Sequence, residues 1–175
     1  MLPQPREESV AFGMRIVSPT EFYRTKESND QPTIFLAGGI SGTEDWQSGV
    51  EDYFDSKCPS LITLNPRRAN FDIANPDDTR HQIMWEHRHL HVADAILFYF
   101  PPPTLCPITL FELGKMAMSA VPLFVCVHPD YSRRLDVIVQ LQLIRPDIVV
   151  VSTLDELMVQ VLAWVQNPKS SSSKL

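Results

Sequence analysis

Five short apolar segments recur along the chain, separated by longer segments whose apolar positions follow a helical period. The apolar segments are TIFLAG (33–38), LITLN (61–65), AILFYF (95–100), LFVCVH (123–128) and IVVVS (148–152). Each is continuous rather than alternating and rich in β-branched or aromatic residues, which is typical of strands covered on both faces. The amphipathic segments predict helices at 44–57, 78–92, 107–120, 131–143 and 154–166.

Strict alternation of strands and helices predicts a parallel sheet with right-handed crossovers. With five strands, we expect a flavodoxin-like three-layer α/β fold with the order 2-1-3-4-5 and helices on both faces. The ligand crevice of such a sheet lies between the carboxyl ends of the first and third strands. This domain is predicted to span 32–167. Residues 1–31 are predicted to form an arm, with MRIVSP (14–19) pairing at an edge, and 168–175 a disordered tail.

The composition narrows the function without naming it. At 175 residues, 44% of them hydrophobic, the chain fits one globular domain. A net charge of −6 argues against a nucleic-acid-coating surface, although it leaves a small phosphorylated ligand open. No apolar segment has the roughly 20 residues of a membrane-spanning helix, and residues 1–12 lack the pattern of a secretory signal. Three cysteines without a disulfide or CxxC pattern, Cys58, Cys106 and Cys126, indicate a reducing compartment.

The first predicted strand ends in the glycine-rich segment AGGISGTEDW. Gly38 and Gly39 allow a tight turn and a close approach of the backbone to a ligand, and Ser41 adds a hydroxyl. The spacing is not GxGxxG, and no acidic residue follows the second strand where a dinucleotide ribose would bind. Two interpretations stay open, a tight connection to the next helix or a cradle for an anion or a sugar.

Arginines follow the second strand, in NPRR. Arg67 and Arg68 are predicted to place two guanidinium groups at the mouth of the crevice, where they would suit a phosphate or a carboxylate. The alternative is that both pair with the acidic NPDD segment at 75–78. A second pair, Arg133 and Arg134, follows the fourth strand.

The helix before the third strand contains a carboxylate and three histidines. Ile83, Glu86 and Leu90 recur at i, i+3 and i+7, which predicts that Glu86 lies on the inward face. His87 and His91, with His89 between them, have a spacing that could suggest a metal. Neither HExxH order nor a further ligand at suitable spacing occurs, so we expect no metal site.

A second carboxylate follows the proline-rich end of the third strand. Ile108 and Phe111 share a helical spacing, and Glu112 lies beside the apolar face that they predict. We therefore expect Glu86 and Glu112 to meet above the first and third strands. Two carboxylates in a partly dry crevice are what glycosyl transfer needs, one acting on the anomeric carbon and one on the leaving group's proton.

At this point the chain resembles a known family. The segments IFLAGGISGTEDW, NPRR, QIMWEHRHLHVADAILFYFPP, PITLFELG and HPDYSRRLDV together resemble the nucleoside 2-deoxyribosyltransferase superfamily, in its broad deoxyribosyltransferase-like branch. The resemblance covers about residues 33–166. It implies a flavodoxin-like fold, cleavage of the N-glycosidic bond of a small-molecule nucleoside or nucleotide, and no metal or organic cofactor.

The resemblance also implies roles for individual residues. Glu112, in the ELG motif, corresponds to the glutamate that attacks C1′ in the family. Glu86, eight positions before Asp94, corresponds to an acidic residue that contacts the nucleobase. The sugar pocket maps onto the end of the first strand, at Gly38, Gly39, Ile40 and Ser41.

Two positions depart from the family's pattern. Phe35 stands where the transferases have a tyrosine that orients the nucleophile, and Cys106 replaces an aspartate six residues before it. The departures argue against true base exchange and leave hydrolysis, an unusual substrate and lost activity open. Trp46, Trp85 and the proline-rich loop are expected to enclose the site.

We therefore expect an N-glycoside hydrolase or a deoxyribosyltransferase-like glycosyltransferase that forms a homodimer or a higher homo-oligomer, because the family commonly builds its sites at dimer interfaces. The alternative from another class is a non-catalytic module that binds a nucleotide or a sugar. A flavodoxin-type FMN protein is disfavoured, since the loop after the first strand lacks a Ser/Thr-rich phosphate-binding segment. The terminal tripeptide Ser173-Lys174-Leu175 predicts peroxisomal import in a eukaryote, and otherwise a cytoplasmic protein.

Overall fold

A computed structural model describes residues 16–17, 31–69 and 71–167 of the chain. Most of the predicted arm and the whole predicted tail lie outside these residues, so both assignments and the peroxisomal signal stay predictions. None of the helices described is long and apolar enough to cross a membrane.

The sheet has six parallel strands in the described part of the chain. They are β1 (Ile16–Val17), β2 (Thr33–Gly38), β3 (Ile62–Asn65), β4 (Ala95–Phe100), β5 (Leu123–Val127) and β6 (Val150–Val151). Their order is β1-β3-β2-β4-β5-β6. The five strands β2 to β6 therefore follow the predicted order 2-1-3-4-5, and the flavodoxin-like prediction is confirmed. Strand β1 pairs with β3 at the edge, within the segment 14–19 for which edge pairing was expected.

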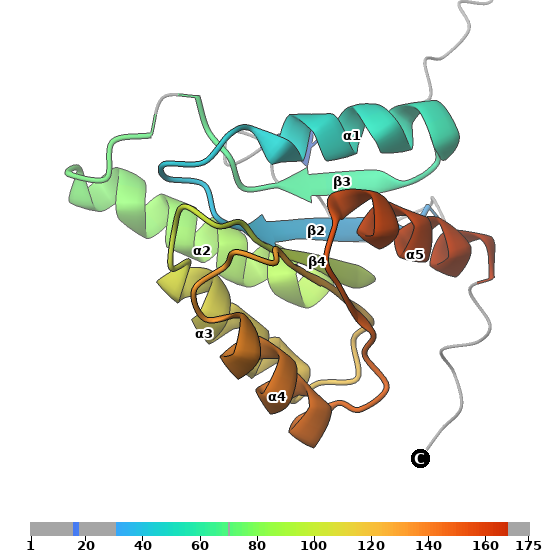
Figure 1. Cartoon of the computed structure of the whole chain (residues 1–175). Coiled ribbons are helices and arrows are strands. Elements are labelled where there is room, and N and C mark those ends of the chain that lie inside the picture. The colour runs from blue at the N-terminus through green and yellow to red at the C-terminus, as the bar shows by residue number, and fades with distance from the viewer. Residues whose placement is uncertain (1–15, 18–30, 70, 168–175) are drawn as a thin grey trace, which may run out of the picture.

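Helices cover the sheet on both faces, as Figure 1 shows. One face carries α1 (Trp46–Lys57) and α5 (Leu154–Gln166), and the other carries α2 (Pro76–Val92), α3 (Pro107–Ala117) and α4 (Arg134–Ile144). Strand residues alternate between two apolar clusters. Phe35 of β2 belongs to the α2–α4 side, and its neighbours Ile34 and Leu36 belong to the α1–α5 side. Burial on both sides explains why the strands are continuously apolar.

Local hydrogen bonds set the helix ends, and they explain the differences from the predicted bounds. Helix α2 begins two residues earlier than predicted, because the Asn75 side chain accepts from the Asp77 amide at 3.0 Å and Pro76 suits the first position. Helix α4 begins only at Arg134, because the preceding segment forms tight turns in which the Tyr131 amide donates to the His128 carbonyl at 3.0 Å. Helix α3 ends at Ala117, three residues earlier than predicted.

The inward faces predicted for α2 and α3 are partly wrong. Ile83 is 59% exposed, whereas Gln82, Trp85, His89 and Leu90 form the buried face of α2. On α3, Ile108 and Phe111 are 64% and 72% exposed, and the buried residues are Thr109, Leu113, Met116 and Ala117. Apolar residues lie on several sides of α3, so the spacing alone did not identify the side that packs on the sheet.

The amino ends of β2 and β4 are joined by side-chain hydrogen bonds. Asp94 Oδ2 accepts from the Thr33 amide at 3.0 Å and from Thr33 Oγ1 at 2.9 Å. The Asp94 amide in turn donates to Thr33 Oγ1 at 2.9 Å. This clamp fixes the register of the two central strands, in which Gly38 pairs with Tyr99 at the opposite end.

Candidate active site

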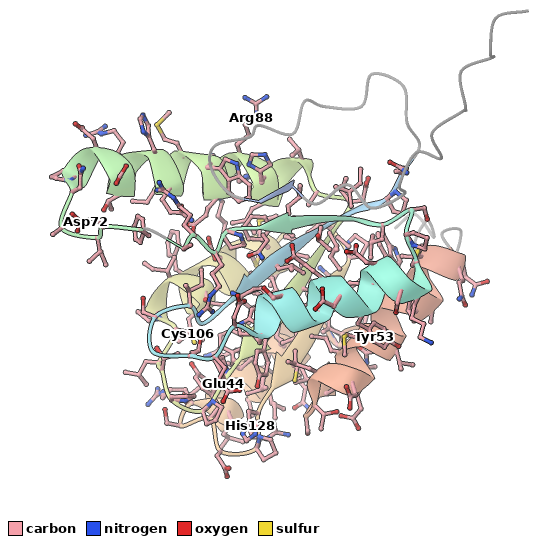
Figure 2. All side chains as sticks on the ribbon, turned by 90° about the horizontal axis from the view of Figure 1, so that it is seen from above. Glu44, Tyr53, Asp72, Arg88, Cys106 and His128 are labelled. Atoms are coloured by element: carbon pink, nitrogen blue, oxygen red, sulfur yellow. The ribbon has the colours of Figure 1, made fainter. Side chains whose placement is uncertain are left out.

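The loops that follow β2, β4 and β5 meet at the carboxyl end of the sheet. Figure 2 shows Glu44, Cys106 and His128, one from each of these loops, at the same end of the molecule. The contact between the first two loops is close, because a Cβ atom on Gly39 would lie 3.0 Å from Cys106 Sγ and 2.8 Å from Thr104 Cγ2. A side chain at position 39 would push these atoms apart, so close packing against the loop after β4 accounts for this glycine. The predicted approach of this backbone to a ligand stays a prediction.

Cys106 lies directly before α3 in the left-handed backbone conformation, with φ 47° and ψ 52°. For a residue with a Cβ atom this conformation costs about 1 to 2 kcal/mol, so the surroundings must hold it. The Cys106 side chain is buried, the Cys106 amide donates to Thr104 Oγ1 at 3.4 Å, and the Tyr131 hydroxyl donates to the Leu105 carbonyl at 2.8 Å. These contacts fix the direction in which α3 starts, and α3 carries Glu112.

Glu112 is a half-buried carboxyl group whose pKa is raised from 4.5 to about 8. Burial makes the largest contribution, because it removes water from the charged form, and the charge of Glu86 adds to it. Lys115, three residues further along α3, acts in the opposite direction. The predicted nucleophile therefore lies in a partly dry place beside a second carboxylate.

Glu86 reaches this place from α2. Burial raises its pKa, and a hydrogen bond from Gln82 Nε2, 2.7 Å from Glu86 Oε1, opposes the rise. The same nitrogen donates to the Pro66 carbonyl at 2.8 Å, directly after β3. Gln82 thus ties Glu86 to the end of the sheet. Glu86 lies near enough to Glu112 for its charge to raise the pKa of Glu112, in agreement with the expected pair, although Ile83 and Phe111 do not flank the two groups inside the core.

Gly38 and Gly39, at the end of β2 and the start of the following loop, are closely packed. A Cβ atom on Gly38 would lie 2.5 Å from the Trp46 ring and 2.6 Å from the Tyr99 carbonyl oxygen. Trp46 Nε1 donates to the Gly39 carbonyl at 2.8 Å, and Thr43 Oγ1 lies 3.0 Å from the same oxygen. Trp46 therefore holds the loop from α1 by its indole N–H. Ile40 is half-buried and Ser41 is exposed in this loop.

The two arginines after β3 have different surroundings. Arg67 donates to the carbonyl oxygens of Thr43 and Glu44 at 3.1 Å each and to Gln47 Oε1 at 3.0 Å, and its Nε lies 3.6 Å from Asp45. Its guanidinium group is thus used to hold the loop after β2.

Arg68 has the weaker set of contacts. Its Nη2 lies 4.0 Å from Asp78, as the alternative interpretation of the pair expected, and its guanidinium lies over the Phe71 ring. Within the described residues, Arg68 Nη1 is buried with no hydrogen-bond partner. A donor of this kind is free to take an anionic group.

The remaining candidates of the sequence have structural contacts. Arg134 donates to the Val127 carbonyl and to Ser152 Oγ, and Arg133 pairs with Asp136 at 3.1 Å. The Trp85 ring stacks on His89, whose Nδ1 lies 2.7 Å from the Trp85 carbonyl oxygen. In the described part of the chain, no group of three or more His, Cys, Asp or Glu side chains is arranged to hold a metal ion.

A cavity of about 1220 Å³ lies at the other end of the sheet and includes none of the predicted site residues. Its lining includes Phe124, Arg145 and Trp164. Each nitrogen of the Arg145 guanidinium group already has a protein partner there, because it pairs with Asp147 at 2.9 Å and donates to the Ser119 carbonyl at 2.8 Å. The chemistry of the half-buried carboxyl groups of Glu86 and Glu112, and not the size of this cavity, therefore identifies the candidate active site.

A comparison with known families supports this assignment. The profile described as "Nucleoside 2-deoxyribosyltransferase like" matches residues 31–131, more than half of the 175-residue chain. The chain belongs to the nucleoside 2-deoxyribosyltransferase-like family. No curated protein matches it in sequence. Family membership points to glycosyl transfer on a small-molecule nucleoside, and the matched range includes Glu86, Glu112 and the glycine-rich loop.

Three residues around the candidate site, Gln82, Lys115 and Tyr131, were not predicted from the sequence. Lys115 and Tyr131 contact partners from other elements, His87 on α2 and Leu105 before α3, and no local spacing predicts such contacts. Gln82 offers one signal, since it lies four residues before Glu86 and so on the same side of α2.

Proposed function

We propose that the protein breaks the N-glycosidic bond of a nucleoside, a nucleotide or a related N-ribosyl compound, with Glu112 as the nucleophile. The carrying observation is the pair of desolvated carboxyl groups, Glu112 on α3 and Glu86 on α2, each with a raised pKa. Two such groups close together do not both ionise readily, so the pair tends to hold one proton. One carboxylate and one carboxylic acid are what a double displacement at C1′ requires.

The reactive form of the pair is the one in which Glu112 is ionised and Glu86 holds the proton; because the pKa of Glu112 is about 8, this is the minor form of the free protein at neutral pH. An oxygen of the Glu112 carboxylate forms a bond to C1′, while the bond from C1′ to the base nitrogen breaks and its electron pair stays on the nitrogen. Protonated Glu86 gives this nitrogen its proton. Water, or a second base in a transfer reaction, then attacks C1′, and the ester bond to Glu112 breaks. The proton of the attacking group passes to the Glu86 carboxylate, which restores the starting state.

The test is a chromatographic screen for base release from a panel of nucleosides and their 5′-monophosphates. Glu112→Gln keeps the size of the side chain but cannot attack, so we expect turnover to fall by roughly 10³ or more. Asp155→Asn makes the same chemical change on α5, on the other face of the sheet, and serves as the matched control. Base release by Glu112→Gln at a rate close to that of the unmodified protein would rule out the covalent mechanism.

Arg68 is proposed to bind the anionic group of a phosphorylated substrate. The support is its buried Nη1 atom, which has no hydrogen-bond partner in the described part of the chain, and its loose contact with Asp78 at 4.0 Å. Arg67 is less suited to this role because the loop after β2 already takes up its donors.

A non-catalytic binding module is the second candidate, and Phe35 is the observation that favours it. Its ring is buried against Trp85, with 6.0 Å between the ring centroids, and it offers no hydroxyl to orient a nucleophile. Calorimetric titration with the same panel separates the two functions. Tight binding of a nucleotide without base release, unchanged in Glu112→Gln, would favour the module.

The protein is further proposed to act as a homodimer or a higher homo-oligomer. Large apolar residues of α2, of α3 and of the position directly after α3 are exposed on this side of the molecule, namely Ile83 at 59%, Ile108 at 64%, Phe111 at 72% and Met118 at 78%. Sedimentation of Phe111→Glu tests this surface, with Val159→Glu, at an exposed position of α5, as the control. An unmodified protein that sediments as a monomer would contradict the proposal.

A further inference from the structure

Gly114 lies in the interior of α3, where glycine destabilises a helix relative to alanine. The packing of this chain does not require a glycine there, because a Cβ atom at Gly114 would meet no described atom within 4 Å. Gly38 and Gly39, in contrast, have neighbours that leave no room for a side chain. The open space over Gly114 therefore needs another explanation.

This space is an apolar groove of about 210 Å³ between α3 and α4, which lie side by side in Figure 1. Leu110 and Leu113 of α3 line one wall, and Val137 and Leu141 of α4 line the other. Pockets for small-molecule ligands are usually larger, at roughly 300 to 1,000 Å³. The groove therefore suits a single inserted side chain better than a substrate.

The surface around the groove, which we call the α3–α4 face, has exposed apolar side chains on both helices. They are 41% to 78% exposed, and they are Ile108, Phe111, Met118, Leu135, Val139 and Leu143. At these exposures, six large side chains present on the order of 800 Å² of apolar area, which is more than the largest patch of a typical monomer. Each partner in a standard protein interface buries roughly 800 Å². The area of this face is thus sufficient for a stable dimer.

The α3–α4 face is complementary to itself. Phe111 is 72% exposed and lies three residues before Gly114, so the projecting ring and the groove lie on adjacent turns of one helix. A two-fold axis between them would bring Phe111 of each copy over Gly114 of the other, as a symmetric dimer requires. Residues 137–144 of α4 include no charged side chain, and charged residues are depleted in the core of interfaces.

We propose that two copies of this chain associate through the α3–α4 face, with Phe111 of each copy inserted into the groove beside Gly114 of the other. The inference rests on the homo-oligomer proposed above and names its interface. It also accounts for the glycine, because a side chain at position 114 would fill the space that the ring occupies.

The experiment is sedimentation velocity of the full-length chain over a series of concentrations, which gives the dissociation constant of the dimer. Gly114→Leu fills the groove, and its helical fold is checked by circular dichroism; the dissociation constant should rise by roughly 10-fold or more. Phe111→Ala removes the ring at an exposed position and should weaken the dimer to a similar extent. Gly49→Leu is the matched control, at an exposed glycine of α1 whose Cβ would also meet no described atom within 4 Å, and should change nothing.

The double variant Phe111→Ala/Gly114→Leu tests whether the two positions meet. The leucine of one copy would then face the space left by the ring of the other, so the double variant should associate more tightly than the two single effects combined predict. Strictly additive effects, or a dimer that neither single variant weakens, would overturn this interface and leave the homo-oligomer standing. An unmodified protein that stays monomeric would contradict both. Base release is measured separately and does not enter this result.

Discussion

The hydroxyl of Tyr131 donates a hydrogen bond to the carbonyl oxygen of Leu105 at 2.8 Å, and so ties the β5–α4 connection to the residue before the left-handed Cys106. The Tyr131 side chain is buried, and its ring packs on Phe100 with 5.3 Å between the ring centroids. Burial raises the pKa of Tyr131 to about 12, so the hydroxyl stays protonated and able to donate.

Tyr131→Phe should therefore loosen the start of α3. It removes the donor and leaves the Leu105 carbonyl without it, which typically costs about 1 to 3 kcal/mol of unfolding free energy. Urea denaturation measures the loss, and base release should fall with it because α3 carries Glu112. Tyr53→Phe on α1 is the control, and we expect it to change the stability by less than about 0.5 kcal/mol. Equal effects of the two substitutions would argue against a special role of the hydrogen bond from Tyr131 to Leu105.

The raised pKa of Glu112 predicts a pH-dependent stability. The folded protein keeps this proton up to about pH 8, whereas the unfolded chain releases it near 4.5. The folded state therefore binds more protons in this window, and the free energy of unfolding contributed by Glu112 falls as the pH rises through it.

Glu112→Gln lacks this titration. Relative to the unmodified protein, it should gain stability steadily between pH 4.5 and about 8, with little further change outside that window. Denaturation curves across this range, run beside Asp155→Asn, measure the difference. A stability difference that does not vary with pH would mean that Glu112 titrates normally in the folded protein.

Gly38→Ala should damage the site from the loop after β2. The new methyl group would lie 2.5 Å from the Trp46 ring and 2.6 Å from the Tyr99 carbonyl oxygen, so β2, β4 or α1 must shift. We expect a loss of at least about 1 to 3 kcal/mol. Gly49→Ala in α1 meets no atom within 4 Å and should instead gain about 0.5 to 1 kcal/mol from helix propensity. Thermal unfolding of the two variants, Gly38→Ala and Gly49→Ala, tests whether the packing around each glycine determines the change in stability.

Substitutions of Arg67 and of Arg68 should have different effects on stability and on substrate preference. Arg67→Met removes the donors that hold the loop after β2, so it should lower stability and reduce base release from a nucleoside and its 5′-monophosphate equally. Arg68→Met should raise KM for the monophosphate alone, and the difference should shrink at high salt. Steady-state kinetics on both substrates measures this, and a loss confined to the monophosphate in Arg67→Met would reverse the assignment.

Much of the fold could be predicted because burial on both faces makes a strand continuously apolar, and β2, β4 and β5 show this pattern without interruption. Helix α5 was predicted to the residue, since Thr153 and Glu156 form a capping box that marks its start. Glu86 and Glu112 were singled out from an acidic residue in an apolar segment and from the family's motifs, and the raised pKa of both carboxyl groups agrees with the expected partly dry site, while their catalytic roles stay predictions.

The parts that could not be predicted depend on contacts between distant residues. The face of α3 was predicted from Ile108 and Phe111, yet both are exposed, because apolar residues lie on several sides of that helix. Arg67, which follows β3, was expected to face a ligand. Instead its guanidinium group packs against the loop after β2, where it donates to the Gln47 side chain, 20 residues away in sequence. Contacts of this kind arise from the packing of elements, which local spacing does not contain.

The clamp between Thr33 and Asp94 bears on how the chain tolerates changes in its length. It holds β2 against β4 at their amino ends, so each added or deleted residue within either strand would move Gly38 away from Tyr99 and exchange the two sides of the sheet beyond that point. Insertions between the strands, in contrast, leave the pairing untouched. Relatives of this protein should therefore differ in length within the connecting loops and keep a constant spacing from the threonine to the paired glycines.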